Sequence, residues 1–270
     1  MSEQAKYPVK TVKKSLDIIE LLMEKDTAGI TEIAGDLSMS KSIVHNHLNT
    51  LEERGYVLSS DGRYKLSFKF LEIGGFKRHR LRLYHAGRSE LVELADSTGQ
   101  MANLATLEQG QCVYLYQAKG ADAIEFEANY EGQYEYMHST AIGKAMMAFL
   151  PQSKVDAIIE THGLPQSTSN TLNDYDTLCE RLRSIKERGY ARDDEESVPG
   201  LRCVAAPIKT RDGDVFGAIS VSGPVSGLKG EFWKETLPEE VQNCANIIEI
   251  NSQFSDPNED AIYENRGEQR

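Results

Sequence analysis

Residues 40–66 decide the fold of the first part of the chain, and they read SKSIVHNHLNTLEERGYVLSSDGRYKL. Apolar residues recur at helical spacing from Val44 through Leu48 to Leu51, which predicts a helix with one apolar face. We expect Ser40 to cap the start of this helix, and Gly55 to end it in the left-handed conformation that glycine tolerates.

A β-hairpin is predicted directly after this helix. Tyr56–Leu58 and Arg63–Leu66 are short strand-like runs, and the dipeptide Asp61-Gly62 between them is a turn signal. Two amphipathic helices are predicted upstream, one over about residues 11–25 and a shorter one after it. Their apolar positions are Val12, Leu16, Ile19 and Met23 in the first and Ile30, Ile33, Ala34 and Leu37 in the second. Three helices followed by a hairpin indicate a winged helix-turn-helix domain over residues 8–67.

The polar face of the third helix has the residue types that contact DNA. It carries no carboxylate, and its members are Lys41, Ser42, His45, Asn46 and Asn49. Lysine and serine contact phosphate, asparagine pairs with an adenine edge, and histidine donates to guanine or phosphate. We expect Ser40, and Arg63 and Lys65 on the hairpin, to add contacts. The alternative is a solvated helix face in a small domain that binds protein.

The charge of the chain is unevenly distributed, although the formal total over 270 residues is −12. Residues 1–88 hold 15 Lys and Arg against 11 Asp and Glu, a net of +4. The remaining 182 residues hold 15 against 31, a net of −16. The basic excess therefore lies in the predicted DNA-binding part, and the total charge does not exclude a DNA partner.

Residues 68–98 are predicted to form linker helices, with a weak point at Gly74-Gly75. The basic run from Lys77 to Arg82 has two open interpretations. It contacts DNA, or it is the solvated side of a linker helix that pairs with its counterpart in a dimer. A regulator with one recognition helix per chain normally binds two half-sites as a dimer.

The pattern changes from residue 99, where a mixed α+β domain with a mainly antiparallel sheet is predicted to extend to residue 254. Strands are predicted over 101–107, 112–116, 124–127, 202–209 and 215–222, and helices over 140–150, 154–160, 174–188 and 238–250. Residues 255–270 are polar, and we expect them to be a disordered acidic tail.

Small and polar residues gather in this domain at His138–Lys144 and in Asp193–Ser222, where a core would have large apolar ones. A helix start at Thr140–Gly143 offers N–H groups to a small anion. Alternate residues on a strand share a face, which groups Ser220 with Ser222 and Leu201 with Cys203. These features predict a pocket for a small carboxylate or sugar acid. Taken singly, a buried cysteine and a solvated acidic turn explain Cys203 and the run that begins at Asp193.

The chain resembles the IclR family of transcription regulators over residues 10–254. The N-terminal motifs are Ser40–His45, Leu48–Leu51 and Gly55–Val57, and the C-terminal ones are His138–Ala145, Arg188–Glu196, Gly200–Pro207 and Ala218–Pro224. The resemblance implies a GAF-like effector-binding domain and a homodimer or a dimer of dimers. It also implies a double-stranded DNA operator as partner, and a small-molecule effector such as a sugar acid, a keto acid or an aromatic acid.

The resemblance also implies which residues bind the effector. They are Ile124, Glu127, Ala141, Ile142, Asp193, Leu201, Cys203, Ser220 and Ser222. Glu127 departs from the family, where an apolar residue is more usual, and a carboxylate there would favour a neutral or hydroxyl-rich ligand over an anion. Asn46 departs where the family often has arginine, which shifts the favoured base contact from guanine toward adenine.

Two other functions compete with a DNA-binding regulator. The first is an enzyme that uses Cys203 as nucleophile with His138 as its base, and the second is an adaptor whose winged domain binds protein. The enzyme is disfavoured because no further triad residue is visible, and we expect no catalytic residues.

Several classes are not expected from the sequence. No stretch of about 18 apolar residues occurs, so no membrane span or membrane partner is expected. The first ten residues lack the apolar segment of a secretory signal. The four cysteines form no C-x-x-C pair, so neither a metal site nor another cofactor is expected, and a cytoplasmic location fits.

Overall fold

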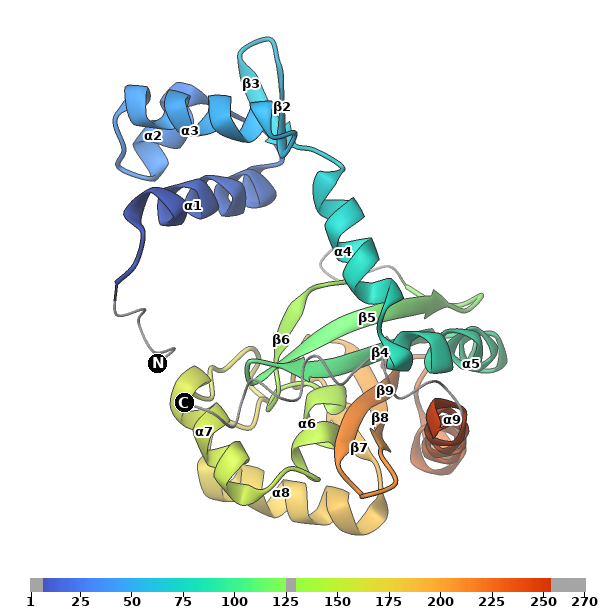
Figure 1. The fold of residues 1–270 in the computed structure, drawn as a ribbon. Coiled ribbons are helices and arrows are strands. Elements are labelled where there is room, and N and C mark those ends of the chain that lie inside the picture. The colour runs from blue at the N-terminus through green and yellow to red at the C-terminus, as the bar shows by residue number, and fades with distance from the viewer. Residues whose placement is uncertain (1–6, 125–129, 254–270) are drawn as a thin grey trace. The chain divides into compact units, whose positions relative to one another are not determined.

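The computed structural model describes residues 7–124 and 130–253. The chain divides into two compact units, and the boundary between them in the sequence falls between Lys77 and Arg78 (Figure 1). Each unit has its own apolar core, and each is described separately below.

The N-terminal unit is a winged helix-turn-helix, as predicted. Its elements are α1 (Lys10–Lys25), β1 (Ala28–Gly29), α2 (Ile30–Asp36), α3 (Lys41–Glu53), β2 (Val57–Ser60) and β3 (Arg63–Leu66). The three strands form an antiparallel sheet in the order β1-β3-β2. The two-residue strand β1 was not predicted, because Ala28 and Gly29 have too short a pattern to mark a strand.

Local backbone chemistry explains the ends of α3 and the hairpin turn. The Ser40 hydroxyl oxygen accepts a hydrogen bond from the Ile43 N–H at 3.3 Å, which is the predicted N-cap. Gly55 has φ +76°, so it adopts the left-handed conformation after the helix. Asp61 and Gly62 have φ of 52° and 76°, as a two-residue hairpin turn with the twist of the strands requires.

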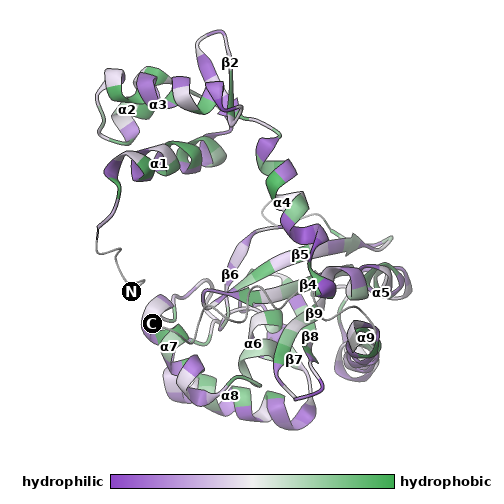
Figure 2. Cartoon of the chain, viewed as in Figure 1, coloured by the Kyte–Doolittle hydropathy of each residue, from purple (hydrophilic) through white to green (hydrophobic). Residues whose placement is uncertain are grey.

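The apolar face predicted for α1 is wrong, although the helix itself is present. The core contains Ile18, Leu21 and Leu22, whereas Val12, Leu16 and Met23 are 56%, 52% and 60% exposed. Hydrophobic and hydrophilic residues alternate along α1 (Figure 2). The helix has two apolar stripes, and packing against α3 and β3 selects the one that carries Ile18. The exposed stripe, which we call the α1 stripe, consists of Val12, Leu16 and Met23, whereas the predicted Ile19 is partly buried against the core.

The predicted linker consists of α4 (Lys69–His79) and α5 (Arg82–Thr98). Gly74-Gly75 does not break α4, and a Cβ atom at either glycine would meet nothing within 4 Å. The helix α5 is more than a linker, because Leu83, Leu91 and Leu94 are buried in the core of the C-terminal unit. This is why the division of the chain falls at Lys77 and not at residue 98.

The C-terminal unit is built on a six-stranded antiparallel sheet in the order β6-β5-β4-β9-β8-β7. Its strands are β4 (Met101–Glu108), β5 (Gln111–Lys119), β6 (Tyr134–Tyr136), β7 (Ala191–Asp194), β8 (Leu201–Lys209) and β9 (Val215–Pro224). The antiparallel sheet was predicted, but the edge strands β6 and β7 were not, because they are short and mostly polar. The strand predicted over 124–127 is not seen at Ile124, and residues 125–127 lie outside the described residues.

Helices cover both faces of this sheet (Figure 1). They are α6 (Ala141–Met147), α7 (Gln152–His162), α8 (Tyr175–Arg188), a π-helical turn (Phe232–Thr236) and α9 (Leu237–Gln253). The helices α5 and α9 pack on one face, and α6, with α8 behind it, packs on the other. No helix in the part of the chain that the structure describes is both long and apolar enough to cross a membrane.

Candidate DNA-binding face and effector cavity

The polar face predicted on α3 is exposed. Apolar residues of α3, including Val44 and Leu48, are fully buried, so the intervening positions point outward. The exposed members are Lys41, Ser42, His45, Asn46 and Asn49. His45 and Asn49 are one helical turn apart and lie within 3.3 Å through Nδ1 and Nδ2. The face presents a cation, two amides, a hydroxyl and an imidazole to the outside of the unit.

Three further residues were predicted to contact DNA, and two of them have partners within the unit. The Ser40 hydroxyl caps α3, as described above. Arg63 donates from Nη2 to the Thr27 carbonyl at 2.7 Å and from Nε to the Thr27 hydroxyl at 3.1 Å, and Nη2 lies 3.5 Å from Glu32 Oε2. Lys65 is exposed on β3. Arg63 therefore ties the hairpin to the start of α2, whereas Lys65 is presented outward.

Seven of the nine predicted effector residues line one cavity of about 100 Å³ in the C-terminal unit. These seven are Ala141, Ile142, Asp193, Leu201, Cys203, Ser220 and Ser222. Strand register brings most of them together, since Asp193 pairs with Cys203 and Cys203 with Ser222 across β7, β8 and β9. Residues paired in this way share a face of the sheet, which here is the face that α6 covers.

Of the other two predicted effector residues, only Ile124 is among the described residues. Ile124 is 48% exposed and does not line the cavity. The structure therefore corrects the prediction that Ile124 belongs to the pocket. Glu127 lies outside the described residues. A carboxylate that does line the cavity is that of Glu135 on β6. The alternation Tyr134-Glu135-Tyr136 was the available signal, because the tyrosines face outward and the glutamate inward.

Sequence reasoning also missed polar lining residues. They are Asn103, Tyr114 and Ser167, whereas Ser139, Thr140, Ser197 and Val198 also line the cavity and fall within the two runs that predicted a pocket. Asn103 is central, because its Nδ2 donates to the hydroxyl oxygens of Ser220 and Ser222 at 3.2 Å each. Gln117 Nε2 donates to Asn103 Oδ1 at 2.9 Å and fixes the orientation of the amide. A polar residue in the otherwise apolar run from Met101 to Ala105 was the signal that could have identified it.

Asp193 is fully buried, and its carboxylate is held by the loop that follows β7. Its Oδ1 accepts from the Glu196 N–H at 2.6 Å and the Ser197 N–H at 3.3 Å, and its Oδ2 accepts from the Ser197 hydroxyl at 2.5 Å. Burial raises the pKa of Asp193, and Lys144 opposes that shift. This aspartate shapes one wall of the cavity through bonds to its own loop.

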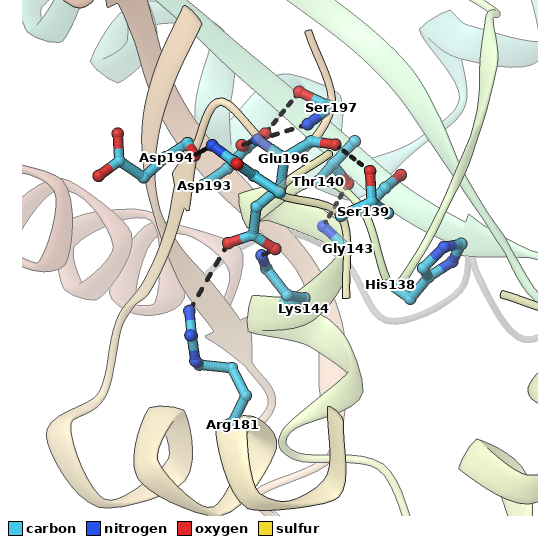
Figure 3. A network of polar contacts seen from close by, with 12 residues as sticks. His138, Ser139, Thr140, Gly143, Lys144, Arg181, Asp193, Asp194, Glu196 and Ser197 are labelled. Atoms are coloured by element: carbon cyan, nitrogen blue, oxygen red, sulfur yellow. Dashed lines mark hydrogen bonds and ion pairs between the residues drawn. The ribbon is translucent and has the colours of Figure 1, made fainter. Parts of the chain in front are cut away.

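A buried charge cluster lies beside this wall, made of Lys144, Arg181, Asp193 and Glu196. Lys144 from α6 donates to Glu196 Oε2, and Arg181 Nη1 from α8 lies 3.6 Å from Glu196 Oε1. Figure 3 shows both cationic side chains directed at the Glu196 carboxylate. Burial lowers the pKa of Lys144 and raises that of Glu196, since low-dielectric surroundings penalise both charged forms.

The thiol of Cys203 is buried in the wall of the cavity. Burial raises the pKa of Cys203 well above its ordinary value, and Asp193 adds to the effect, so the thiol stays protonated at neutral pH. His138 donates its Nε2–H to the Pro165 carbonyl at 3.0 Å, and it does not line the cavity. The predicted base therefore makes its observed hydrogen bond elsewhere.

Comparisons with known proteins agree with both units. The profile described as the IclR helix-turn-helix domain matches residues 11–60, and the one described as bacterial transcriptional regulator IclR C-terminal matches residues 77–250. The second profile alone covers more than half of the chain. Its start at residue 77 coincides with the division seen in the structure.

Individual relatives cover most of the chain. It is 31% identical over 245 residues to the probable HTH-type transcriptional regulator ArcR of Halobacterium salinarum, with 90% of this chain and 93% of the relative covered. It is 31% identical to the HTH-type transcriptional regulator KdgR of Escherichia coli, with 84% and 87% covered. It is 34% identical to the HTH-type transcriptional regulator BhcR of Paracoccus denitrificans, with 80% and 78% covered.

Solved structures share the fold. The IclR protein of Thermotoga maritima superposes with a TM-score of 0.76 at 28% identity, covering 91% of this chain and 99% of that one. An IclR homologue of Microbacterium hydrocarbonoxydans, solved in complex with 4-hydroxybenzoate, has a TM-score of 0.78 at 17% identity and covers 91% and 100%. The chain belongs to the IclR family, and it is a DNA-binding transcription regulator whose C-terminal domain binds a small-molecule effector that modulates operator binding.

Proposed function

We propose that α3 is the recognition helix, and that Lys41, Ser42, His45, Asn46 and Asn49 contact the operator, with Lys65 on a phosphate. The observation that carries this assignment is an exposed face on α3 without a carboxylate, opposite a fully buried apolar stripe. The two exposed amides suit adenine edges in the major groove, and the lysine suits phosphate. Ser40 and Arg63 support the geometry of the domain and contribute less to DNA affinity.

We further propose that the effector binds in the cavity between α6 and the sheet. It is lined by hydroxyl, amide and carboxylate groups, and its lining includes seven residues that the family resemblance implies. A structural relative was solved with 4-hydroxybenzoate, which supports a small molecule as effector. Sugar acids, keto acids and aromatic acids are the effector classes that the family resemblance implies for this site.

The functional unit is proposed to be a homodimer or a dimer of dimers. One recognition helix per chain suits a dimer on two half-sites. The α1 stripe gives a dimer surface, since Val12, Leu16 and Met23 are each more than half exposed. A Leu16→Glu variant should shift sedimentation toward the monomer, while Lys13→Glu, exposed on the same helix outside the stripe, should not. An unchanged sedimentation profile for Leu16→Glu would place the dimer surface elsewhere.

An enzymatic role is not proposed, because the Cys203 thiol is buried and its pKa is raised. A reactive thiolate would show as alkylation of the intact protein with a midpoint below pH 8, and we expect none at Cys203. Because its partner is operator DNA, the protein is proposed to act in the cytoplasm.

The test of the whole proposal uses the full-length protein and the DNA upstream of its own gene and the neighbouring genes. Footprinting should reveal a DNA site that the protein protects even in the presence of excess random DNA. Replacing Ser220 and Ser222 by phenylalanine should fill the cavity and abolish the response to the native effector, while operator binding persists. If the variant still responds to the effector, the cavity is not the effector site. If no DNA site is protected, the protein does not recognise a specific operator in this region.

A further inference from the structure

The wall of the effector cavity carries negative charge without a matching cation. Glu135 and Asp193 both line it, whereas none of its described lining residues is Lys, Arg or His. A carboxylate ligand is usually recognised by arginine or lysine, and beside an ionised Glu135 it would be repelled. The composition of the wall therefore works against an anionic ligand.

The two basic residues of the charge cluster beside the cavity are already paired. Lys144 is fully buried and bonds to Glu196, and Arg181 lies 3.6 Å from the other oxygen of the same carboxylate. With Asp193 included, these four residues have a formal charge of zero. Glu135 is additional to that balance and, when ionised, gives the described residues of the site a formal charge of −1. Burial raises the pKa of Glu135, and the hydrogen bond from Gln133 opposes that shift.

The hydrogen-bonding groups of the wall suit hydroxyl groups. Asn103 donates to the oxygens of Ser220 and Ser222. The Ser222 hydroxyl is also hydrogen-bonded to Cys203, so the proton left to be donated to a ligand is that of Ser220. Glu135 accepts from Gln133 Nε2 through Oε1 at 2.7 Å, and its Oε2 has no hydrogen bond to the described residues. A ligand hydroxyl both donates and accepts, so it can satisfy a serine and a carboxylate together, whereas a carboxylate only accepts.

Glu135 also has a possible structural explanation, because inward charges on edge strands discourage pairing with another chain. It sits on β6, the edge of the sheet, opposite Cys112. The two explanations differ in what they predict for ligands. An edge-protecting glutamate would affect self-association alone, whereas a wall residue would affect which ligand binds.

We propose that the effector is a small, neutral, hydroxyl-rich molecule, and that Glu135 discriminates against its carboxylate analogues. This inference rests on the proposed function, because it assigns chemistry to the same cavity. It narrows the classes that the family resemblance implies, since it excludes a ligand recognised through a carboxylate.

The test compares neutral and acidic ligands of the same carbon skeleton by calorimetry on the full-length protein without DNA. The pairs are glycerol with glycerate, xylitol with xylonate and glucitol with gluconate, together with the aldoses xylose and glucose. We expect a neutral member to bind and its acid to bind at least about tenfold more weakly. Glu135→Gln should reduce this preference by about tenfold, while Glu187→Gln, an exposed glutamate on α8, should leave it unchanged.

The outcomes separate this inference from the proposed function. Tighter binding of the acids, an unchanged preference in Glu135→Gln with normal unfolding, or no binding by any neutral member would each overturn the inference. The Ser220→Phe, Ser222→Phe variant provides the second arm. If ligands bind wild type but bind that variant equally well, the cavity is not the effector site and the proposed function fails. If acids bind and the variant abolishes their binding, only the present inference fails.

Discussion

The two candidate sites of this chain are built in opposite ways. The DNA-binding face comes from one helix, where five exposed side chains fall within nine residues of α3. The effector cavity gathers side chains from seven elements, and one of its hydrogen bonds joins residues 119 positions apart. A helix face is fixed by periodicity alone, whereas the cavity is fixed by strand register and by buried charges. Substitutions in the two sites should therefore differ in kind as well as in size.

The largest effect is expected for Lys144→Met in the C-terminal unit. Removing one partner leaves the buried Glu196 without its main counter-charge, so the free energy of unfolding should fall by about 3–5 kcal/mol. Urea denaturation measures this change. Lys186→Met on the exposed side of α8 is the control and should change stability by less than about 0.5 kcal/mol. A loss below about 1 kcal/mol for Lys144→Met would show that the pair contributes little.

A smaller effect, confined to DNA binding, is expected for two substitutions on α3. Asn46→Ala should weaken operator binding by about 1–3 kcal/mol and relax the preference for one base pair. Lys41→Ala should weaken binding to operator and random DNA alike, and it should lower the salt slope by about one. Quantitative footprinting at several salt concentrations measures both. An equal loss on random DNA for Asn46→Ala would make it a phosphate contact.

The same contrast explains what could be predicted from the sequence. Val44, Leu48 and Leu51 predicted α3 because their spacing admits one buried face, and Ser40 predicted its first turn. The α1 face was wrong because the helix offers two apolar stripes. Only the positions of neighbouring elements decide between them, and a single sequence does not contain those positions.

The cavity was predicted through the family resemblance, and its gaps have physical causes. Ile124 was assigned to the pocket through the resemblance, on a predicted strand of only four residues, 124–127, which is too short a pattern to fix a strand. Glu135 was missed because a three-residue edge strand has no pattern long enough to detect. Asn103 was missed because it is brought next to Ser220 by the register of β4 and β9, and a single sequence does not reveal strand register.

Ser40→Ala should cost about 1 kcal/mol of stability, since it removes the N-cap of α3. The matched control is Ser42→Ala on the exposed face of the same helix, which should leave the unfolding midpoint in place. Operator affinity should show the opposite order: Ser42→Ala should weaken operator binding more than Ser40→Ala, because Ser42 is a proposed phosphate contact. If Ser40→Ala weakened DNA binding more than Ser42→Ala at equal folded fraction, Ser40 would be a contact as well as a cap.

The smallest effect is expected from pH through His138. Burial lowers the pKa of His138 below its ordinary value near 6.5, so the folded state holds this proton less readily than the unfolded state. The contribution of His138 to stability should therefore be full above pH 7 and should fall as pH drops below about 6.5. Denaturation curves of wild type and His138→Gln between pH 5 and 8 measure the difference. If the free energy of unfolding had the same pH dependence in wild type and in His138→Gln, protonation of His138 would not be the cause of the change.

The position of Glu196 also limits how this sequence can change over evolutionary time. It lies between β7 and β8 and holds one cation from α6 and another from α8. A lineage that lost Lys144 first, or Glu196 first, would pass through an intermediate with an uncompensated buried charge. Positions 144 and 196 are therefore expected to be replaced together or not at all, whereas the partly exposed Arg181 can be exchanged on its own.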